Sequence, residues 1–232
     1  MNVKYSTILL VFAHPDDEVL ACGATVAKLS EQGHRIFTLI LGEGVTARQE
    51  QRNPELVAQE LVSLRGAALK ANERIGVKSE CVHLCGLPDN RFDTVPLLDV
   101  VREIERMIKE VEPTIIFTHW QNDLNIDHQI TYRAVLTATR PQPNHCVREI
   151  YACEVLSATE WIYPQDFQPS VYSILSEENL CSKIDALRCY SSEIRHYPHP
   201  RSVEGVEYLA RLRGLQVGYC YAEAFQLVRR II

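Results

Sequence analysis

Hydrophobic residues along the chain form two kinds of segment, and the two kinds alternate. Short continuous runs of branched and aromatic residues predict strands that are buried on both faces, as in a parallel sheet. These runs lie at residues 8–13, 35–41, 81–84, 114–118, 151–154 and 219–228. Longer segments with apolar residues three or four positions apart predict amphipathic helices. These lie at residues 19–29, 56–75, 97–111, 130–138, 177–190 and 203–216, and a polar segment at residues 46–53 predicts a mobile loop over the sheet edge.

Strands that alternate with helices favour crossover connections between parallel strands. We therefore expect an α/β fold with a Rossmann-like, mainly parallel sheet flanked by helices on both faces. The chain has 232 residues, of which 46% are hydrophobic, so it can bury a full core. No internal repeat or linker divides it, and residues 1–232 are predicted to form a single domain.

Composition excludes several classes of protein. The net charge is −6 and there is no long basic run, so nucleic acid is not an expected partner. No apolar stretch approaches the length of a membrane span, so we expect no membrane association. The eight cysteines form no Cys-x-x-Cys pair, and no signal peptide opens the sequence, which indicates reduced thiols in a cytoplasmic protein. A dinucleotide fingerprint (G-x-G-x-x-G) and a serine-hydrolase elbow (G-x-S-x-G) are also missing.

Polar residues crowd the end of the first predicted strand. His14, Asp16 and Asp17 follow the apolar run directly, at the edge where open α/β sheets bind ligands. His14 and Asp17 can bind one divalent metal, and a nitrogen with a carboxylate oxygen suits zinc. Asp16 is then free to take a proton from water as a general base. The alternative is that one acidic residue caps the next helix while His14 makes a single hydrogen bond in the loop.

A second polar cluster follows the fourth predicted strand and contains Asn125, Asp127 and His128. In a parallel sheet the two clusters meet if their strands are close neighbours. Catalytic zinc sites have three protein ligands and one open position, so we predict that His128 is the third ligand. Asp127 is the expected acidic neighbour, because ligating histidines commonly have a carboxylate partner. The alternative for His128 is a helix cap or a surface position.

A late segment, Pro-His-Pro-Arg-Ser at residues 198–202, adds two further candidates. Its two prolines restrict the backbone to an extended form. His199 can act as a general acid or as a hydrogen-bond donor to an oxyanion, and Arg201 can bind an anionic part of the substrate. The alternative is a rigid surface loop with solvated side chains.

The hexapeptide Ala-His-Pro-Asp-Asp-Glu at residues 13–18, placed after a buried strand, resembles the signature of the LmbE-like, or PIG-L, zinc-dependent N-deacetylases. The segments Tyr-Ser-Ser-Glu at 190–193 and 198–202 are similar to the sugar-deacetylase branch of that family. Nearly the whole chain takes part in the resemblance.

The resemblance implies hydrolysis of an N-acetyl group on a small-molecule substrate, an amino sugar or a sugar conjugate, which can be nucleotide-linked. It implies zinc as cofactor, and iron(II) or another divalent ion can use the same ligands. It also implies that Arg65 and Asp89, the latter in a Leu-Pro-Asp loop, bind substrate hydroxyls. Without the resemblance, Arg65 would belong to a solvated helix face and Asp89 to an ordinary turn.

The chain departs from the family pattern at one position. Many members have His-x-Asp-His where this chain has Asn125-Ile126-Asp127-His128. An Asn amide can donate to an oxyanion, but it cannot hold a positive charge or transfer a proton. Asn125 is therefore a candidate for oxyanion stabilisation, and another group such as His199 is needed as the acid.

Two alternative functions stay open. One is an amidase or deacetylase that acts on a low-molecular-weight thiol or its conjugate. The other is a zinc-, sugar- or nucleotide-binding module without turnover, which would have no use for the unligated carboxylate of Asp16. A homo-oligomer is compatible with either function, and the sequence does not determine the oligomeric state.

Overall fold

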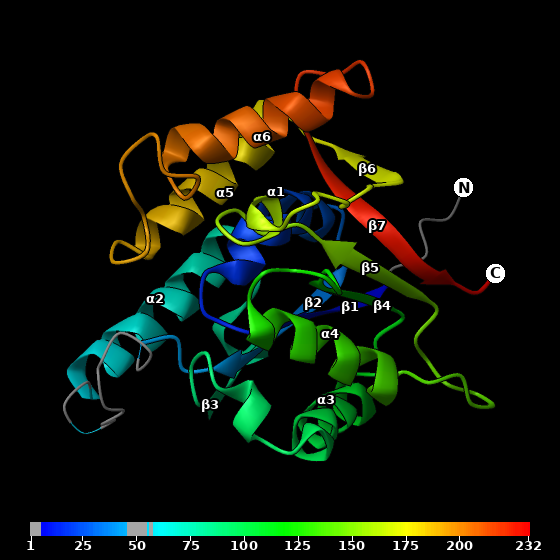
Figure 1. The fold of residues 1–232 in the computed structure, drawn as a ribbon. Coiled ribbons are helices and arrows are strands. Elements are labelled where there is room, and N and C mark those ends of the chain that lie inside the picture. The colour runs from blue at the N-terminus through cyan, green and yellow to red at the C-terminus, as the bar shows by residue number, and fades with distance from the viewer. Residues whose placement is uncertain (1–5, 46–54, 56–57) are drawn as a thin grey trace.

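The sheet of the computed structural model, which describes residues 6–45, 55 and 58–232, has the strand order β3-β2-β1-β4-β5-β7-β6 (Figure 1). β1 pairs in parallel with β2 and β4, and the pairs β2–β3 and β4–β5 are also parallel. β7 runs antiparallel to both β5 and β6. The strands are β1 Thr7–Phe12, β2 Arg35–Gly42, β3 Val82–Leu87, β4 Ile115–His119, β5 Glu149–Cys153, β6 Val171–Ile174 and β7 Ala222–Arg230.

Helices cover both faces of this sheet. α3 and α4 lie on one face, whereas α1 and α2 lie on the other, where α5 packs against α1 and α2 and α6 packs against β7 and α5 (Figure 1). The α/β fold predicted from the alternating pattern is thus confirmed, with a mixed sheet. The helices are α1 Asp17–Glu31, α2 Ala58–Arg74, α3 Leu97–Val111, α4 Ile126–Ala138, α5 Glu177–Cys189 and α6 Val203–Leu215.

The central position of β1 in the sheet explains why residues 8–12 of this strand are all apolar. Ile8, Leu10 and Phe12 pack into the core under α1, α2 and α5. Leu9 and Val11 pack into the opposite core under α3 and α4. Alternate side chains of a strand point to opposite faces, and a central parallel strand is buried on both. The polar residues that follow the strand, beginning at His14, lie beyond its carboxyl end, at one edge of the sheet.

The order of the strands creates a crevice at the centre of the sheet. The chain proceeds from β1 outward to β2 and β3, then returns to place β4 on the other side of β1. The loops after β1 and β4 therefore leave the sheet side by side and diverge to opposite faces. Open α/β sheets bind their ligands at such a switch point, beyond the carboxyl ends of the strands.

Some element boundaries differ from those predicted. α4 begins at Ile126 rather than at residue 130, because the side chain of Asn125 accepts a hydrogen bond from the backbone N–H of Asp127 and caps the helix. The short edge strand β6 was not predicted, since its four residues are all only partly buried and give a weak pattern. The predicted loop at residues 46–53 and the first two residues of the helix predicted at 56–75 lie outside the described residues.

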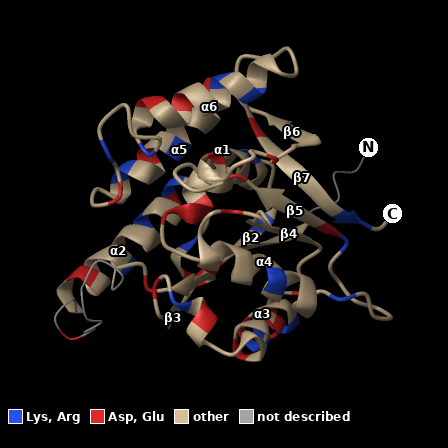
Figure 2. Cartoon of the chain, viewed as in Figure 1, with Lys and Arg blue, Asp and Glu red and all other residues tan. Residues whose placement is uncertain are grey.

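Charges are mixed over the outer surface. Lys and Arg lie among Asp and Glu on α2, α3, α5 and α6 in the view of Figure 2. None of the helices in the described part of the chain combines the length and apolarity that crossing a bilayer requires.

Candidate metal centre and active site

Three of the predicted site residues converge at the ends of β1 and β4. Nδ1 of His14 lies 3.3 Å from Oδ2 of Asp17, and Nε2 of His128 lies 3.2 Å from the same oxygen. All three residues are buried, with exposed fractions of 9% or less. The neighbouring strands bring the loop at residues 13–17 and the start of α4 together, as the sequence predicted.

The geometry of this group fits a divalent metal. Metal–ligand bonds of 2.0–2.1 Å in a tetrahedron separate the ligand atoms by about 3.3 Å, close to the two measured separations. Two imidazole nitrogens and one carboxylate oxygen also match the donor set of catalytic zinc sites. In addition, Oδ1 of Asp17 is buried without a hydrogen-bond partner among the described residues. His14, Asp17 and His128 can therefore hold a metal and leave a coordination position open.

The surrounding charge also favours a cation. Burial alone would lower the pKa of His14, but its hydrogen bonds to Asp127 and Asp17 raise that pKa to about 10. Burial opposes protonation of His128 as well, yet the charge of Asp17 and the bond to Asp123 raise its pKa to about 9. At both histidines the neighbouring carboxylates therefore favour positive charge.

Asp127 contacts His14 rather than the histidine next to it in sequence. Its Oδ2 lies 2.9 Å from Nε2 of His14, and its Oδ1 accepts a hydrogen bond of 2.9 Å from the backbone N–H of Phe92. Asp89 lies on the same side, with Oδ1 3.3 Å from Nε2 of His14. The two carboxylates orient the ring so that its other nitrogen faces Asp17.

The carboxylate partner of His128 is Asp123, which sequence reasoning missed. Oδ2 of Asp123 lies 3.1 Å from Nδ1 of His128, and the hydroxyl of Thr159 donates to the same oxygen over 3.1 Å. Asp123 is fully buried in the loop between β4 and α4. Its position five residues before His128 carries no periodic signal, because the loop path alone determines where its side chain points.

His119, at the end of β4, was missed as well. Its Nε2 accepts a hydrogen bond of 2.9 Å from the backbone N–H of Ala13, and its ring stacks on His128 with centroids 3.7 Å apart. Burial, together with the nearby charge of His128, lowers the pKa of His119 well below its usual value. A neutral His119 thus joins the two strand ends and supports the ring of His128. The only signal for His119 in the sequence was the apolar run at residues 114–118, which indicates that a strand ends at this position.

Asp16 lies beside the metal-binding group without belonging to it. Its backbone is in the left-handed region, with φ of 106°, which turns its carboxylate away from Asp17. Oδ2 of Asp16 accepts a hydrogen bond of 2.8 Å from Nη1 of Arg201. Burial raises the pKa of Asp16 to about 7, although the charge of Arg201 lowers it. The carboxylate is 2% exposed and is held as a base with a pKa near neutrality.

The guanidinium of Arg201, which the sequence predicted to bind an anionic part of the substrate, contacts other side chains of the protein. Besides Asp16, its guanidinium contacts Ser157 Oγ at 2.6 Å and Glu193 Oε2 at 3.8 Å. The structure thus connects Arg201 to the candidate base. His199, two residues earlier, accepts a hydrogen bond from the backbone N–H of Arg201 and packs edge-on against Trp161.

The remaining predicted site residues, Asn125, Asp89 and Arg65, lie at different positions relative to the candidate metal ligands. Asn125 caps α4, and its amide nitrogen donates to Oδ1 of Asn90 over 3.0 Å, so both of its polar atoms already have partners. Asp89 belongs to the cluster around His14. Arg65 is exposed on α2, and no hydrogen bond or ion pair within the described part of the chain joins it to the cluster. The substrate-binding roles of Arg65 and Asp89 stay predictions.

Comparison with known families gives a match that covers the cluster. The family described as PIG-L, GlcNAc-PI de-N-acetylase, matches residues 9–139. This range contains His14, Asp16, Asp17 and His128, whereas His199 and Arg201 lie beyond it.

Comparison with individual proteins extends over most of the chain. A protein of Bacillus cereus named probable N-acetyl-alpha-D-glucosaminyl L-malate deacetylase 2 is 28% identical over 188 residues, which are 80% of this chain and 83% of that protein. The N,N'-diacetylchitobiose deacetylase of Pyrococcus horikoshii superposes with a TM-score of 0.76 at 17% identity, covering 97% of this chain and 84% of the other.

A third protein shows what structural similarity leaves open. The 4-carboxy-2-hydroxymuconate hydratase GalB of Pseudomonas putida superposes with a TM-score of 0.77 at 20% identity, covering 98% of each chain. At this level of identity the two solved structures establish the fold and leave the reaction to be argued from the site.

Proposed function

The chain belongs to the PIG-L (GlcNAc-PI de-N-acetylase) family, and from this premise we propose that it is a zinc-dependent hydrolase that removes an N-acetyl group from an amino sugar or sugar conjugate. Deacetylases of this family depend on a metal, and the Bacillus cereus and Pyrococcus horikoshii proteins are named as deacetylases. The observation that carries the proposal is the carboxylate of Asp16. It is buried beside the candidate ligands, is not one of them, and is held by an arginine.

Amide hydrolysis makes three chemical demands. The carbonyl must be polarised, the attacking water must lose a proton, and the departing nitrogen must gain one. A divalent metal held by His14, Asp17 and His128 would polarise the carbonyl oxygen and lower the pKa of water to about 7. The remaining demands fall on the side chains of the chain itself.

Asp16 is the proposed general base. Its pKa of about 7 makes the carboxylate a stronger base than an exposed one, and a large fraction is still ionised at neutral pH. The ion pair with Arg201 keeps the carboxylate in one orientation. A positioned base of this kind typically contributes about 10²- to 10⁴-fold to the rate.

The proton for the departing nitrogen must come from a group other than Asn125, because an amide has no proton to transfer near neutral pH. His199 remains the proposed donor from the late segment. The amide nitrogen of Asn125, which has a second N–H beyond its bond to Asn90, is the proposed oxyanion donor.

The substrate class is proposed from the relatives. The Bacillus cereus protein is named for an N-acetylglucosaminyl conjugate of malate, and the Pyrococcus horikoshii protein for an N-acetylated disaccharide. We therefore place N-acetylglucosamine conjugates first among the substrates of this chain, ahead of free N-acetyl sugars and of thiol conjugates.

The direct test is acetate release from a panel of N-acetylglucosamine conjugates, nucleotide-linked N-acetyl sugars, free N-acetyl sugars and thiol conjugates. We expect release from at least one conjugate, its loss after treatment with a chelator, and its return when zinc is added. Iron(II) is added in a parallel arm to compare the two ions. Zinc-replete protein that releases no acetate from any of these compounds would contradict the proposal.

Substitution of Arg201 distinguishes two roles for this residue, which are holding the carboxylate of Asp16 and binding an anionic group of the substrate. If it holds the base, Arg201→Met should lower kcat by about 10- to 100-fold with little change in KM, because a catalytic group displaced by about 1 Å loses up to about 10² in rate. Steady-state kinetics on the best substrate of the panel measures both constants. Arg201→Lys, which keeps the charge, is the control and should retain more activity. A raised KM at unchanged kcat would instead support the binding of an anionic substrate group.

A further inference from the structure

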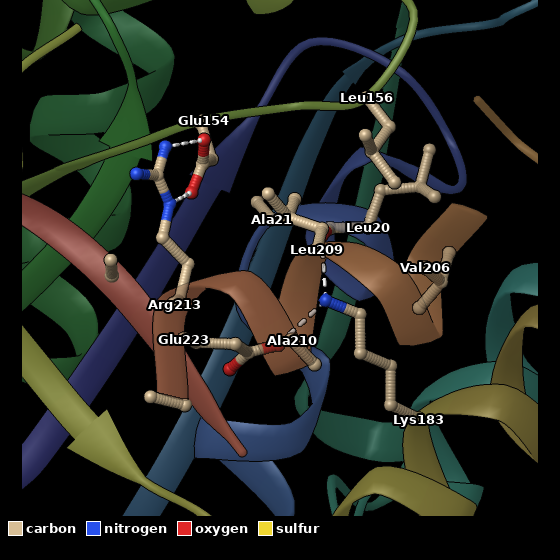
Figure 3. Close-up of a pocket in the computed structure, with 12 residues that line it drawn as sticks. Leu20, Ala21, Glu154, Leu156, Lys183, Val206, Leu209, Ala210, Arg213 and Glu223 are labelled. Carbon is tan, nitrogen blue, oxygen red and sulfur yellow. Dashed lines mark hydrogen bonds and ion pairs between the residues drawn. The ribbon is translucent and has the colours of Figure 1, made fainter. Parts of the chain in front are cut away.

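Helix α1 is interrupted at Cys22, whose φ of −147° and ψ of 17° are not helical. In a continuous helix the N–H of Ala24 would donate to the carbonyl of Leu20. Here the carbonyl of Leu20 accepts from Nζ of Lys183 over 2.7 Å, and the N–H of Ala24 donates to Oε1 of Glu223 over 3.2 Å. Nζ of Lys183 also donates to Oε1 of Glu223 over 2.6 Å (Figure 3). An ion pair is thus inserted into one backbone hydrogen bond of the helix.

The interruption leaves a second backbone group that Glu223 also satisfies. Its Oε2 accepts a hydrogen bond of 2.7 Å from the N–H of Thr25. The carboxylate therefore caps the second part of α1 as an N-cap side chain would, with its negative charge at the positive end of the helix dipole. Lys183 neutralises the same carboxylate from the other side, and the two residues are only 4% and 6% exposed.

The sequence of α1 is adapted to this arrangement at Gly23. A Cβ atom at that position would lie 3.2 Å from Val19 Cγ1 and 3.3 Å from Lys183 Cγ. Glycine lets the aliphatic stem of Lys183 pass directly against the helix. Three separate segments, α1, α5 and β7, thus supply matched groups to one interruption, which indicates that it is a fixed feature of the fold.

The interruption divides α1 into two parts with different tasks. The first turn carries Asp17, which faces His14 and His128, and Glu18, which accepts hydrogen bonds from the hydroxyl of Tyr190 over 2.5 Å and from Nδ2 of Asn72 over 3.0 Å. The second part runs beside α5, where Nδ2 of Asn179 donates to Oε2 of Glu31 over 3.1 Å. Separating the two parts lets the first turn follow the site while the rest follows the core.

We propose that the ion pair of Lys183 and Glu223 holds α1 in its interrupted form and thereby positions the turn that carries Asp16 and Asp17 at the metal site. The inference rests on the proposed function, in which these two residues act. Lys183 and Glu223 contact neither the candidate ligands nor Asp16, and they act through the backbone of α1. They are positioning residues.

A second buried ion pair in the same region provides a matched control. Nε of Arg213 on α6 donates to Oε1 of Glu154 over 2.7 Å, and its Nη2 donates to the other oxygen (Figure 3). Arg213 and Glu154 are 8% and 9% exposed, comparable with the first pair. Their hydrogen bonds involve no backbone group of α1. Loss of either pair should lower the thermal stability, but only the first should affect the metal.

The experiment compares the purified, full-length variants Lys183→Met, Lys183→Arg, Glu223→Gln and Arg213→Met with the original chain. Zinc affinity is measured by competition with a chelator, and amide hydrogen exchange is followed at Ala24 and Thr25. We expect Lys183→Met to weaken zinc binding by about 10- to 100-fold, the range typical for residues that support a ligand indirectly. Its kcat should fall with KM within about twofold, because the defect is in the metal site rather than in substrate binding.

The other variants complete the comparison. Lys183→Arg should recover most of the zinc affinity, because a guanidinium can donate to both the carbonyl and the carboxylate. Glu223→Gln keeps the shape of the side chain but offers an NH₂ group where two acceptors are needed. Amide hydrogen exchange at Ala24 or Thr25 should therefore accelerate at least about tenfold. This variant tests the inference even if Lys183→Met does not fold. Arg213→Met should retain the original zinc affinity and the original exchange rates at both amides.

Two results would overturn the inference. One is a folded Lys183→Met protein with the original zinc affinity and kcat. The other is an Arg213→Met protein whose zinc affinity falls as far as that of Lys183→Met, since general destabilisation would then explain both. Failure of the proposed function is distinguishable, because a chain inactive on every amide would still report zinc affinity and amide exchange.

Discussion

His128→Ala is expected to remove the metal and to lower kcat/KM by about 10³-fold or more. A metal acting as a Lewis acid contributes several kcal/mol to transition-state stabilisation, and each 1.36 kcal/mol corresponds to about tenfold in rate. Nε2 of His128 lies 3.2 Å from Oδ2 of Asp17, so its loss leaves only two of the three convergent donors. Catalytic zinc sites use three protein ligands, so the two that remain are not expected to retain the ion. His14→Ala should behave in the same way.

Metal content per chain, measured after dialysis against metal-free buffer, tests this expectation. Asp123→Asn is the graded control, since it keeps the His128 ring but replaces the charged partner 3.1 Å from Nδ1. It should weaken zinc binding by about 10- to 100-fold and leave the bound metal active. Stoichiometric zinc in both alanine variants, held with the original affinity, would exclude the two histidines as ligands.

Asp16→Asn is expected to lower kcat by about 10²- to 10⁴-fold while the bound metal stays at one per chain. Asparagine cannot accept a proton near neutral pH, but its carbonyl can still accept the hydrogen bond from Arg201. Asparagine is also the best replacement for the backbone, because φ of 106° at this position is tolerated by Asn and Asp better than by other residues with a Cβ. The variant therefore removes the base with little change in the fold.

Single-turnover and steady-state kinetics, with metal analysis of the same samples, separate loss of the base from loss of the ion. Asp99→Asn makes the same chemical change at an exposed position in the first turn of α3 and should leave kcat unaltered. An Asp16→Asn enzyme with the original kcat would remove Asp16 from the mechanism. A variant that loses its metal would show that Asp16 supports binding of the ion.

Much of the frame around the site could be predicted from the sequence. The apolar run of β1 stops at His14 and Pro15 because a buried strand needs apolar side chains on both faces and proline has no N–H for the ladder. The alternation of strands and helices then implies parallel neighbours, whose ends lie at one edge of the sheet. The convergence of His14, Asp17 and His128 follows from these local patterns and from the order of β1 and β4.

Where the local pattern is weak, the start of α4 and the strand β6 could not be predicted correctly. The apolar pattern of α4 is broken by Asp127 and His128, so the helix was expected to begin after them. Its capping residue, Asn125, lies where many members of the family carry a histidine, so the sequence indicated a chemical role for this residue and gave no sign that it also caps the helix. β6 is short, lies at the edge of the sheet and is only half-buried, and its alternation is too weak to distinguish it from a loop.

The sequence by itself thus determined the fold class and which residue types gather at the sheet edge. Only the tertiary structure decided which carboxylate meets which cation. Asp127 and His128 are adjacent in sequence, but successive side chains on a helix point about 100° apart, so Asp127 faces His14 and His128 is left to Asp123. Asp16 and Arg201 are 185 positions apart, and their contact depends on how α5 and α6 pack over the sheet. Periodicity reports the face on which a side chain lies, whereas its partner is set by whatever the rest of the chain packs opposite that face.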